Sequence, residues 1–227
     1  VEAQAQMCTP EKISWVAERH PGCTVAIGLE AYDDRVLRFH VNKGFTTKQW
    51  HSAVQMLRDN NLRVKTYLLF KPPFMSEGDA LVHTTSWLTE VAQYSDEVSV
   101  NPMNIQKNTI VDRLFRNKEY RPPWLWSLVE MILRSHEHLG DDSCRIIVHP
   151  TAGGKIRGAH NCGECDSEVV AAIERYSVSG DTEEFSHLEC SCKSHWRAEI
   201  ENDNSFPIPL GSGTFRRGNP TDIVRAP

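Results

Sequence analysis

The 227-residue sequence predicts an α/β fold, in which parallel strands alternate with helices, followed by a small cysteine-rich module. Over the first 150 positions, strand-like and helical patterns alternate at intervals of roughly 35 residues, which is typical of right-handed βαβ units. Beyond position 150 the composition changes, and four of the seven cysteines fall within residues 162–192. We therefore expect an α/β unit at 1–150, a metal module at 151–201 and an irregular tail at 202–227.

Five segments have the composition of strands. Residues 1–7 alternate in polarity, whereas the run at 23–30 is apolar almost throughout, like a parallel strand that is covered on both faces. β-Branched and aromatic residues fill 63–70. A short strand that runs into a polar loop is predicted within 97–104, and a last strand at 146–148. These segments predict a parallel sheet or barrel.

Helices are predicted between the strands, mainly from their capping residues. Thr9 and Pro10 suit the start of one helix, and the segment from Thr46 to Gln49 has the pattern of a capping box. The helix after Thr46 presents apolar residues at the spacing of one buried face: Trp50, Ala53, Val54 and Leu57. Further helices are expected near 33–41, 76–94, 109–117, 123–139 and 167–177.

Charge and cysteine usage limit the class of protein. The net charge of -5 argues against a protein that coats nucleic acid non-specifically, although a locally basic surface could still bind phosphates. No apolar run approaches the length of a membrane span, and the cysteines cluster instead of forming spread pairs, so we expect a cytoplasmic protein. The chain opens within a strand pattern without a Met or a signal peptide, and we expect earlier residues to lie elsewhere.

The cysteine cluster is the sharpest local signal. Two short pairs, separated by 24 residues, have the spacing of a tetrahedral metal site: Cys162, Cys165, Cys190 and Cys192. Zn²⁺ is the favoured ion, with an auxiliary iron-sulfur cluster or free thiols as alternatives. A flanking histidine could replace one thiolate, although such a residue is more often a neighbour of the site: His160, His187 or His195.

Polar residues follow several predicted strands, where parallel α/β folds build their binding sites. Glu30 suits a polar substrate group such as a ribose hydroxyl, or it caps the next helix. Lys71, before a stiff Pro-Pro loop, suits an anionic ligand, or it is an ordinary exposed lysine. Asn101 and Asn104 offer amides to a base or an amino-acid group, or they form an Asx turn.

The glycine-rich segment 151–158 lacks the upstream glycine of a P-loop. Lys155 and Arg157 within it are instead candidate phosphate contacts beside the metal module. Trp124 and Trp126 are expected to pack in the core in preference to stacking on bases. No catalytic triad, HExxH or GxGxxG pattern occurs in the sequence.

Several strings together are similar to one family. They are Gly28-Leu29-Glu30, Asn42-Lys43-Gly44-Phe45, the 67–74 segment YLLFKPPF, Asn101-Pro102-Met103-Asn104, the 120–126 segment YRPPWLW and the 157–163 segment RGAHNCG. In this order, over about residues 1–200, the sequence resembles the archaeosine-biosynthesis radical S-adenosylmethionine proteins.

The resemblance implies a partial (βα)6 radical S-adenosylmethionine barrel, of which this chain would hold the later strands. In that family an iron-sulfur cluster bound by CxxxCxxC cleaves S-adenosylmethionine to a radical, yet no CxxxCxxC occurs here. We therefore expect the cluster loop upstream of Val1 and an inactive isolated chain. Glu2 and Glu30 fall where strand ends of such barrels approach S-adenosylmethionine.

The implied reaction cleaves a lysine C–N bond on a 7-deazaguanine in the D-loop of archaeal tRNA, leaving archaeosine. The implied partner is the synthase that attaches the lysine. Lys71, Asn101 and Asn104 would bind the substrate, while Lys155 and Arg157 would dock tRNA with the cysteine module. The alternatives are another radical enzyme that modifies RNA and a non-catalytic zinc-containing module that binds RNA.

Overall fold

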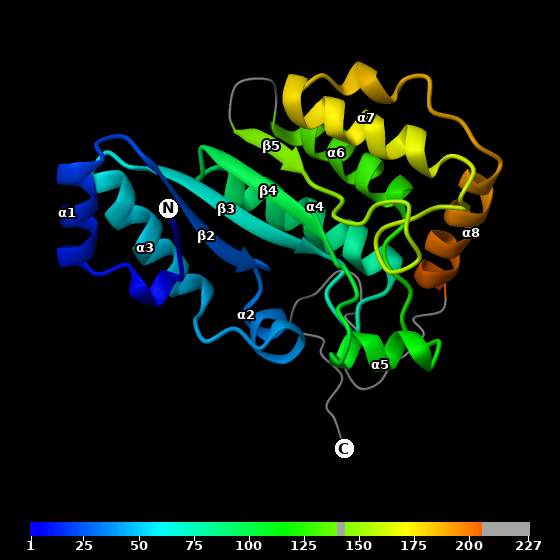
Figure 1. The fold of residues 1–227 in the computed structure, drawn as a ribbon, viewed down its shortest axis with the longest axis horizontal. Coiled ribbons are helices and arrows are strands. Elements are labelled where there is room, and N and C mark those ends of the chain that lie inside the picture. Colours follow the sequence, from blue (N-terminus) through cyan, green and yellow to red (C-terminus); the bar gives the residue numbers. More distant parts are fainter. Residues whose placement is uncertain (140–143, 206–227) are drawn as a thin grey trace.

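A single parallel sheet organises the computed structural model, which describes residues 1–139 and 144–205 (Figure 1). The five strands lie in sequence order and every neighbouring pair is parallel. They are β1 (Glu2–Ala3), β2 (Thr24–Glu30), β3 (Arg63–Phe70), β4 (Glu97–Pro102) and β5 (Arg145–Val148). The predicted α/β class with a parallel sheet and a C-terminal four-cysteine group is confirmed.

The longer helices gather on one side of the sheet (Figure 1). They are α1 (Pro10–Arg19), α3 (Thr47–Asp59), α4 (Glu77–Ala92), α6 (Leu125–Leu139) and α7 (Asp166–Ser179). Short helices follow the carboxyl ends of strands: α2 (Asp34–Val36) with the π-helix Leu37–Val41 after β2, and α5 (Ile110–Arg116) after β4. Helix α8 (Cys192–Ser205) lies against α4, and 3-10 turns occupy Ala5–Met7 and Thr182–Phe185.

Side-chain caps start most of these helices at the predicted residues. Thr9 accepts a hydrogen bond from the backbone of Lys12 at the start of α1. At α3 the capping box is complete, because Thr46 accepts from the backbone of Gln49 and the Gln49 side chain accepts from the Thr46 backbone. Each cap satisfies N–H groups that have no partner inside the helix.

The two faces of the sheet differ sharply. Residues of β2 and β3 that point toward the helices are buried, as Ile27 and Leu68 show at 0% exposure. On the opposite face Lys65 pairs with Glu97 at 2.5 Å, and Tyr67 is half-buried. Since successive strand residues alternate between faces, this polar side remains available for a site.

One apolar core extends from the sheet into the cysteine-rich region. It joins Ile27 of β2, Leu68 of β3, Ile173 of α7 and Trp196 of α8 in a single cluster. A second, smaller cluster of Ile105, Val111 and Tyr120 holds α5. The division of the chain at residue 150 stays a prediction.

Three expectations need correction. The predicted strand at 1–7 contains only Glu2–Ala3, because the chain turns into the 3-10 helix before reaching the cap of α1. Helix α8 was not expected, and it includes residues 202–205, which were assigned to an irregular tail. The rest of that predicted tail, 206–227, lies outside the described residues. Helix α8 was missed because its sequence is mostly polar and shows little helical periodicity. Its few apolar residues pack against helices that lie far away in the sequence.

Among residues 1–139 and 144–205, no helix combines the length and the apolar character needed to cross a lipid bilayer.

Candidate metal centre and strand-end site

The four predicted cysteines converge on one point. All four sulfur atoms lie within 4.8 Å of one another, at Cys162, Cys165, Cys190 and Cys192. The Sγ atoms of Cys162 and Cys165 are 3.9 Å apart, and those of Cys162 and Cys190 and of Cys165 and Cys192 are 3.7 Å apart. The structure therefore brings together two pairs that are 24 residues apart in the sequence.

These sulfur separations fit a single ion. Four thiolates bound at about 2.3 Å around one tetrahedral ion lie about 3.8 Å from each other, which matches the three pairs at 3.7–3.9 Å. A four-iron cluster binds each thiolate to a different iron, which spreads the sulfurs further apart. The donor set and its geometry suit one metal ion with four thiolate ligands.

The turn between the first two ligands is built by Asp166 at the start of α7. Its carboxylate accepts hydrogen bonds from the backbone N–H groups of Asn161 at 2.9 Å and Gly163 at 2.6 Å. Gly163 has a φ of 96°, a conformation that suits glycine because it has no Cβ. This buried carboxylate folds the CxxC segment so that both sulfurs point the same way.

Two side-chain N–H groups donate to the buried sulfurs. The indole Nε1 of Trp126 donates to Cys192 Sγ at 3.2 Å, and Asn161 Nδ2 donates to Cys165 Sγ at 3.3 Å. Asn161 also accepts from the backbone N–H of Trp126 through Oδ1, at 3.3 Å. Helix α6 thereby contacts Cys192 directly and Cys165 through Asn161. N–H donors of this kind stabilise thiolate charge.

The thiols differ in acidity. The backbone N–H of Cys165 lowers the pKa of Cys162 to about 7, whereas burial raises the pKa of Cys192 to about 11. Burial likewise raises the pKa of Cys165 well above its ordinary value. The buried thiols therefore become thiolates only when a cation replaces their protons, so metal binding releases protons.

Glu30 ends β2 on the open face of the sheet. Its Oε1 accepts from Lys43 Nζ at 3.0 Å, and both side chains remain about one-fifth exposed, at 23% and 22%. A Cβ on Gly28 would lie 2.7 Å from Glu30 Oε1 and 3.3 Å from Lys43 Nζ, so a side chain there would displace the ends of this pair. The arrangement presents opposite charges side by side over the sheet.

Glu2 lies on the same face but further back along the strands. Its carboxylate accepts from the Tyr67 hydroxyl at 3.1 Å, and burial raises the pKa of Tyr67. Glu2 pairs with Ala26, four residues before Glu30, which corresponds to roughly 13 Å at the rise of a strand. The two predicted cofactor residues thus share a face without being adjacent.

Lys71 is buried, not exposed. Its Nζ donates to Glu77 Oε2 at 2.6 Å, with side-chain exposures of 5% and 0%. Glu77 Oε1 also accepts from the backbone of Trp124, and Tyr120 donates to the Lys71 carbonyl. Lys71 and Glu30 both have positive φ angles, 57° and 73°, which are uncommon outside glycine and often occur at functional sites.

The remaining predicted residues meet near the end of β4. Asn101 is the penultimate residue of β4, and Asn104 follows two residues after the strand. The next residue, Ile105, exchanges hydrogen bonds with Arg157: its N–H donates to the Arg157 carbonyl and its own carbonyl accepts from Arg157 Nε. Lys155 lies exposed in the same loop as Arg157, so the structure brings Asn104, Lys155 and Arg157 into one neighbourhood.

A cavity of about 570 Å³ opens beside Lys71. Its lining includes the Lys71–Glu77 pair, Tyr120, Arg121 and His160. Burial lowers the pKa of both Arg121 and His160 and raises that of Tyr120. Buried groups with shifted acidity at the carboxyl ends of parallel strands are typical of a substrate pocket.

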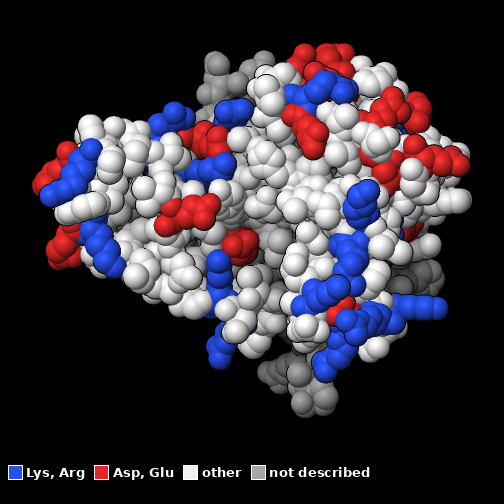
Figure 2. Space-filling view, viewed as in Figure 1, with Lys and Arg blue, Asp and Glu red and all other residues white. Residues whose placement is uncertain are grey.

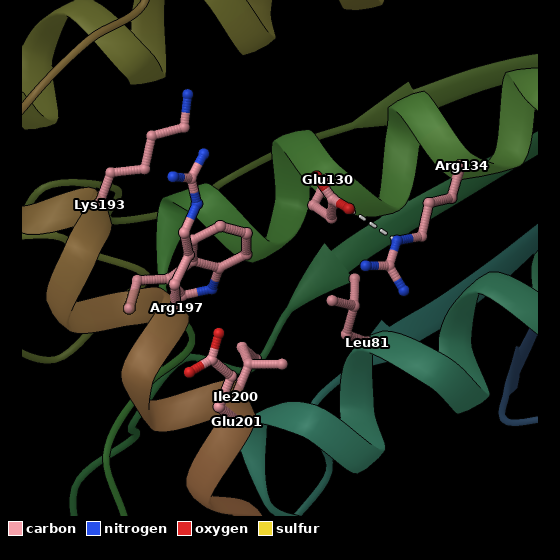
Figure 3. Close-up of a pocket in the computed structure, with 8 residues that line it drawn as sticks. Leu81, Glu130, Arg134, Lys193, Arg197, Ile200 and Glu201 are labelled. Atoms are coloured by element: carbon pink, nitrogen blue, oxygen red, sulfur yellow. Dashed lines mark hydrogen bonds and ion pairs between the residues drawn. The ribbon is translucent and has the colours of Figure 1, made fainter. Parts of the chain in front are cut away.

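A second cavity, of about 320 Å³, lies on the helical side between α4, α6 and α8 (Figure 3). Arg134 on its wall is already paired with Glu130 at 2.7 Å, and Glu201 adds another negative charge. Its mixed charges do not converge on a common ligand position. It is the space left where α8 packs against the other helices.

Several site residues were not identified from the sequence. Lys43, Tyr67 and Glu77 contact predicted residues, but only the folded chain brings them there. Trp126 was expected to pack in the core, which its 2% exposure confirms, yet its N–H···S contact was missed. The string RGAHNCG contained the only signal for Asn161, as the residue just before the first cysteine.

No protein-family model matches the sequence. Among curated proteins, it is 33% identical over 187 residues to archaeosine synthase subunit beta of Methanosarcina acetivorans. It is 35% identical over 205 residues to archaeosine synthase subunit beta of Thermococcus kodakarensis. An uncharacterized protein of Methanocaldococcus jannaschii is 30% identical over 192 residues.

These alignments cover 82%, 89% and 82% of this chain but only 54%, 63% and 51% of the respective relatives. The chain therefore spans less than two thirds of the length of each. Among solved structures, Methanocaldococcus infernus Elp3 with an N-terminal deletion has the same fold over 79% of this chain and 41% of its own, with a TM-score of 0.60 at 16% identity.

Proposed function

We propose that this chain provides the later barrel strands and a metal module of a radical S-adenosylmethionine enzyme that forms archaeosine in tRNA. The observation that carries the proposal is the similarity, at 33% and 35% identity, to two archaeosine synthase beta subunits. The fold shared with Elp3 and the polar open face of the sheet support it.

The proposed reaction is cleavage of the C–N bond of a lysine attached to a 7-deazaguanine in the tRNA D-loop. S-adenosylmethionine bound with a reduced iron-sulfur cluster supplies the 5'-deoxyadenosyl radical for this step. This sequence contains no CxxxCxxC, so we propose that the cluster ligands are not in this chain and that the chain alone is inactive.

Within this proposal, Glu30 and Lys43 bind the amino-acid part of S-adenosylmethionine. Their carboxylate and ammonium groups, 3.0 Å apart, match the opposite charges of an α-amino acid. Glu2 lies on the same face, where it would contact another polar group of the cofactor.

Substrate contacts are proposed for Lys71, Asn101 and Asn104 at the strand ends, beside the cavity that Lys71 lines. Lys155 and Arg157 would contact the tRNA backbone. The word "subunit" in the relatives' name supports a complex with the lysine-transferring synthase. The clustered thiols support a reducing, cytoplasmic setting.

We propose Zn²⁺ as the ion of the four-cysteine site. The sulfur separations of 3.7–3.9 Å support one ion, and four thiolates are soft ligands that suit zinc. Protein purified without air should contain about one zinc per chain by elemental analysis. A brown sample that loses its colour in Cys162→Ala would instead identify an iron-sulfur cluster at this site.

Calorimetric titration with S-adenosylmethionine tests the proposed cofactor site. Glu30→Gln and Lys43→Met should each weaken binding about tenfold, since each removes one charged contact worth about 1.4 kcal/mol. Lys48→Met, which changes an exposed lysine on α3, should bind as the wild type does. Equal affinity in all four proteins would place the cofactor elsewhere.

Incubation under reducing conditions tests the proposed lack of activity. The isolated chain should release no 5'-deoxyadenosine, and measurable release would contradict the proposal that the cluster ligands are absent.

The missing CxxxCxxC also favours a second candidate, a metal-stabilised RNA-binding module without catalysis. That candidate predicts tRNA binding together with no binding of S-adenosylmethionine.

A further inference from the structure

We infer that α5 and the glycine-rich loop form one basic surface that binds the phosphate backbone of RNA. This RNA surface is defined by Lys107, Arg113, Arg116, Lys118 and Lys155. The inference rests on the proposed function, which takes tRNA as the partner. It adds helix α5 to the predicted tRNA contacts, which were Lys155 and Arg157 together with the cysteine module.

The charge distribution is strongly one-sided. Residues 105–121 and 151–161 contain seven Lys or Arg but only two Asp or Glu, although the whole chain carries a net charge of -5. In the adjacent segment 162–190 the balance is reversed, with eight acidic residues and one basic residue. Figure 2 shows basic side chains gathered over α5 and the neighbouring loop, and acidic ones over α7.

Four of these cations are free to meet a ligand. Lys107, Arg113, Lys118 and Lys155 are exposed, and none of them forms an ion pair with any residue in 1–139 or 144–205. Arg116 is also exposed, at 64% of its side chain, while one of its nitrogens is held 2.6 Å from Asp112. Cations left unpaired on one surface raise the local potential, and an anionic polymer that binds there releases counterions.

The surface is held rigid from beneath by Asp112. This buried carboxylate accepts from Arg157 Nη2 at 2.6 Å, from Arg116 Nη2 at 2.6 Å and from the backbone of Asn108 at 3.0 Å. It thus joins the loop that carries Lys155 to the helix that carries Arg113. A preorganised set of cations loses less entropy when it binds than a mobile one does.

The position of this surface favours RNA over other polyanions. Helix α5 follows the carboxyl end of β4, and the glycine-rich loop follows β5, so both lie at the edge of the sheet where β4 ends, next to Asn101. A backbone bound there places its bases beside the strand ends. Ile156, 69% exposed between Lys155 and Arg157, and Ile110, 49% exposed at the start of α5, add apolar contacts that suit sugars and bases better than a lipid headgroup layer.

The test uses residues 1–227 and fluorescently labelled tRNA in anisotropy titrations at several salt concentrations. In the surface variant the four unpaired cations become glutamine: Lys107→Gln, Arg113→Gln, Lys118→Gln and Lys155→Gln. Its affinity should fall at least about thirtyfold at 0.1 M salt. The slope of log K against log salt should become shallower by about 3, because each lost phosphate contact changes it by roughly 0.7–0.9.

A matched control removes four exposed cations from other elements: Lys12→Gln, Lys48→Gln, Arg58→Gln and Arg197→Gln. It should bind tRNA within about threefold of the wild type, since its charges lie outside the RNA surface. A charge-conserving variant with Lys107→Arg, Arg113→Lys, Lys118→Arg and Lys155→Arg should also retain binding, which separates loss of charge from loss of folding.

The outcomes distinguish this inference from the proposed function. If wild type binds tRNA and the surface variant binds equally well, the RNA surface is wrong while the tRNA function stands. If wild type fails to bind tRNA even at 0.05 M salt, the proposed substrate itself is contradicted. Tighter binding to phosphatidylserine vesicles or to polyglutamate than to tRNA would overturn RNA as the partner.

Discussion

The side chain of Trp126 both packs in the core and supports the metal site. Its ring is buried in the core, while its Nε1 donates to Cys192 Sγ at 3.2 Å. Trp196, also buried, donates its Nε1–H to Ser127 Oγ at 2.8 Å instead of to a ligand sulfur. The two tryptophans therefore separate packing from support of the metal site.

Trp126→Phe should keep most of the packing and remove the N–H···S hydrogen bond. We expect a ten- to hundredfold loss of metal affinity, the usual effect of removing a group that supports a ligand. Competition with a colorimetric chelator measures this. Trp196→Phe is the control, which should lower stability by a similar amount and leave metal affinity unchanged. Equal metal affinity in both variants would mean that Trp126 does not support the metal site.

Asp112 makes the stability of the folded chain around α5 depend on pH. The hydrogen bond from Arg157 is the main cause that lowers the pKa of this carboxyl from 3.8 to about 2. A group whose pKa is depressed by folding stabilises the folded state above its unfolded pKa, and this contribution is lost as the pH falls through the folded value. The stabilisation from Asp112 is therefore complete above about pH 5 and disappears between about pH 4 and pH 2.

Asp112→Asn should remove this pH-dependent stabilisation. Urea unfolding of the wild type and the variant at several pH values measures the difference in their free energies of unfolding. We expect a constant difference from pH 5 to 7 that shrinks as the pH falls toward 2. A difference that does not change with pH would mean that Asp112 is protonated alike in the folded and unfolded chains.

Among the elements, α3 shows how far local signals define the fold. Its capping box is complete and its predicted inward residues, Trp50, Ala53, Val54 and Leu57, are all buried. Thr46→Ala should cost about 1 kcal/mol, or a fall in melting temperature of roughly 2–4 °C for a protein of this size.

Thr47→Ala, one residue further into α3, is the matched control, because no side-chain hydrogen bond of Thr47 contributes to the cap. It should melt within about 1 °C of the wild type. Differential scanning calorimetry compares the three proteins. Equal melting temperatures for Thr46→Ala and wild type would mean that water replaces the cap hydrogen bond without loss of stability.

The strands and most helices could be predicted because their signals are local: capping residues, apolar periodicity and β-branched runs. Helix α8 could not, because helices far earlier in the chain bury Trp196 and partly bury Ile200. The metal ligands were identified from spacing alone. The Arg157–Asp112 and Lys71–Glu77 contacts were not. The first joins residues 45 positions apart, and in the second a buried carboxylate pairs with Lys71, which was predicted to bind an anionic ligand or to be exposed.

At the scale of the whole molecule, the core is continuous. Leu68 in the sheet and Ile173 in α7 belong to the same apolar cluster, although residues 151–201 are predicted to be a separate module. The four-cysteine site adds a cross-link between the segment just before α7 and the start of α8. Packing across residue 150 should therefore couple the two regions.

We expect one cooperative thermal transition for the metal-bound chain, because regions that share a core unfold together. Calorimetric and van't Hoff enthalpies should agree. The control is the same protein treated with a strong chelator, which should melt at a lower temperature. Two resolved transitions in the metal-bound protein would support an independent module that begins near residue 151.

The order of the four ligands along the chain has a consequence for synthesis. Cys162 and Cys165 leave the ribosome before Cys190 and Cys192, by roughly 1 to 6 seconds at about 5–20 residues per second. During that interval the emerging chain has two thiolates and no complete site, while α7 and its acidic residues are already being made. Full metal coordination therefore has to wait until Cys190, and Cys192 at the start of α8, have left the tunnel.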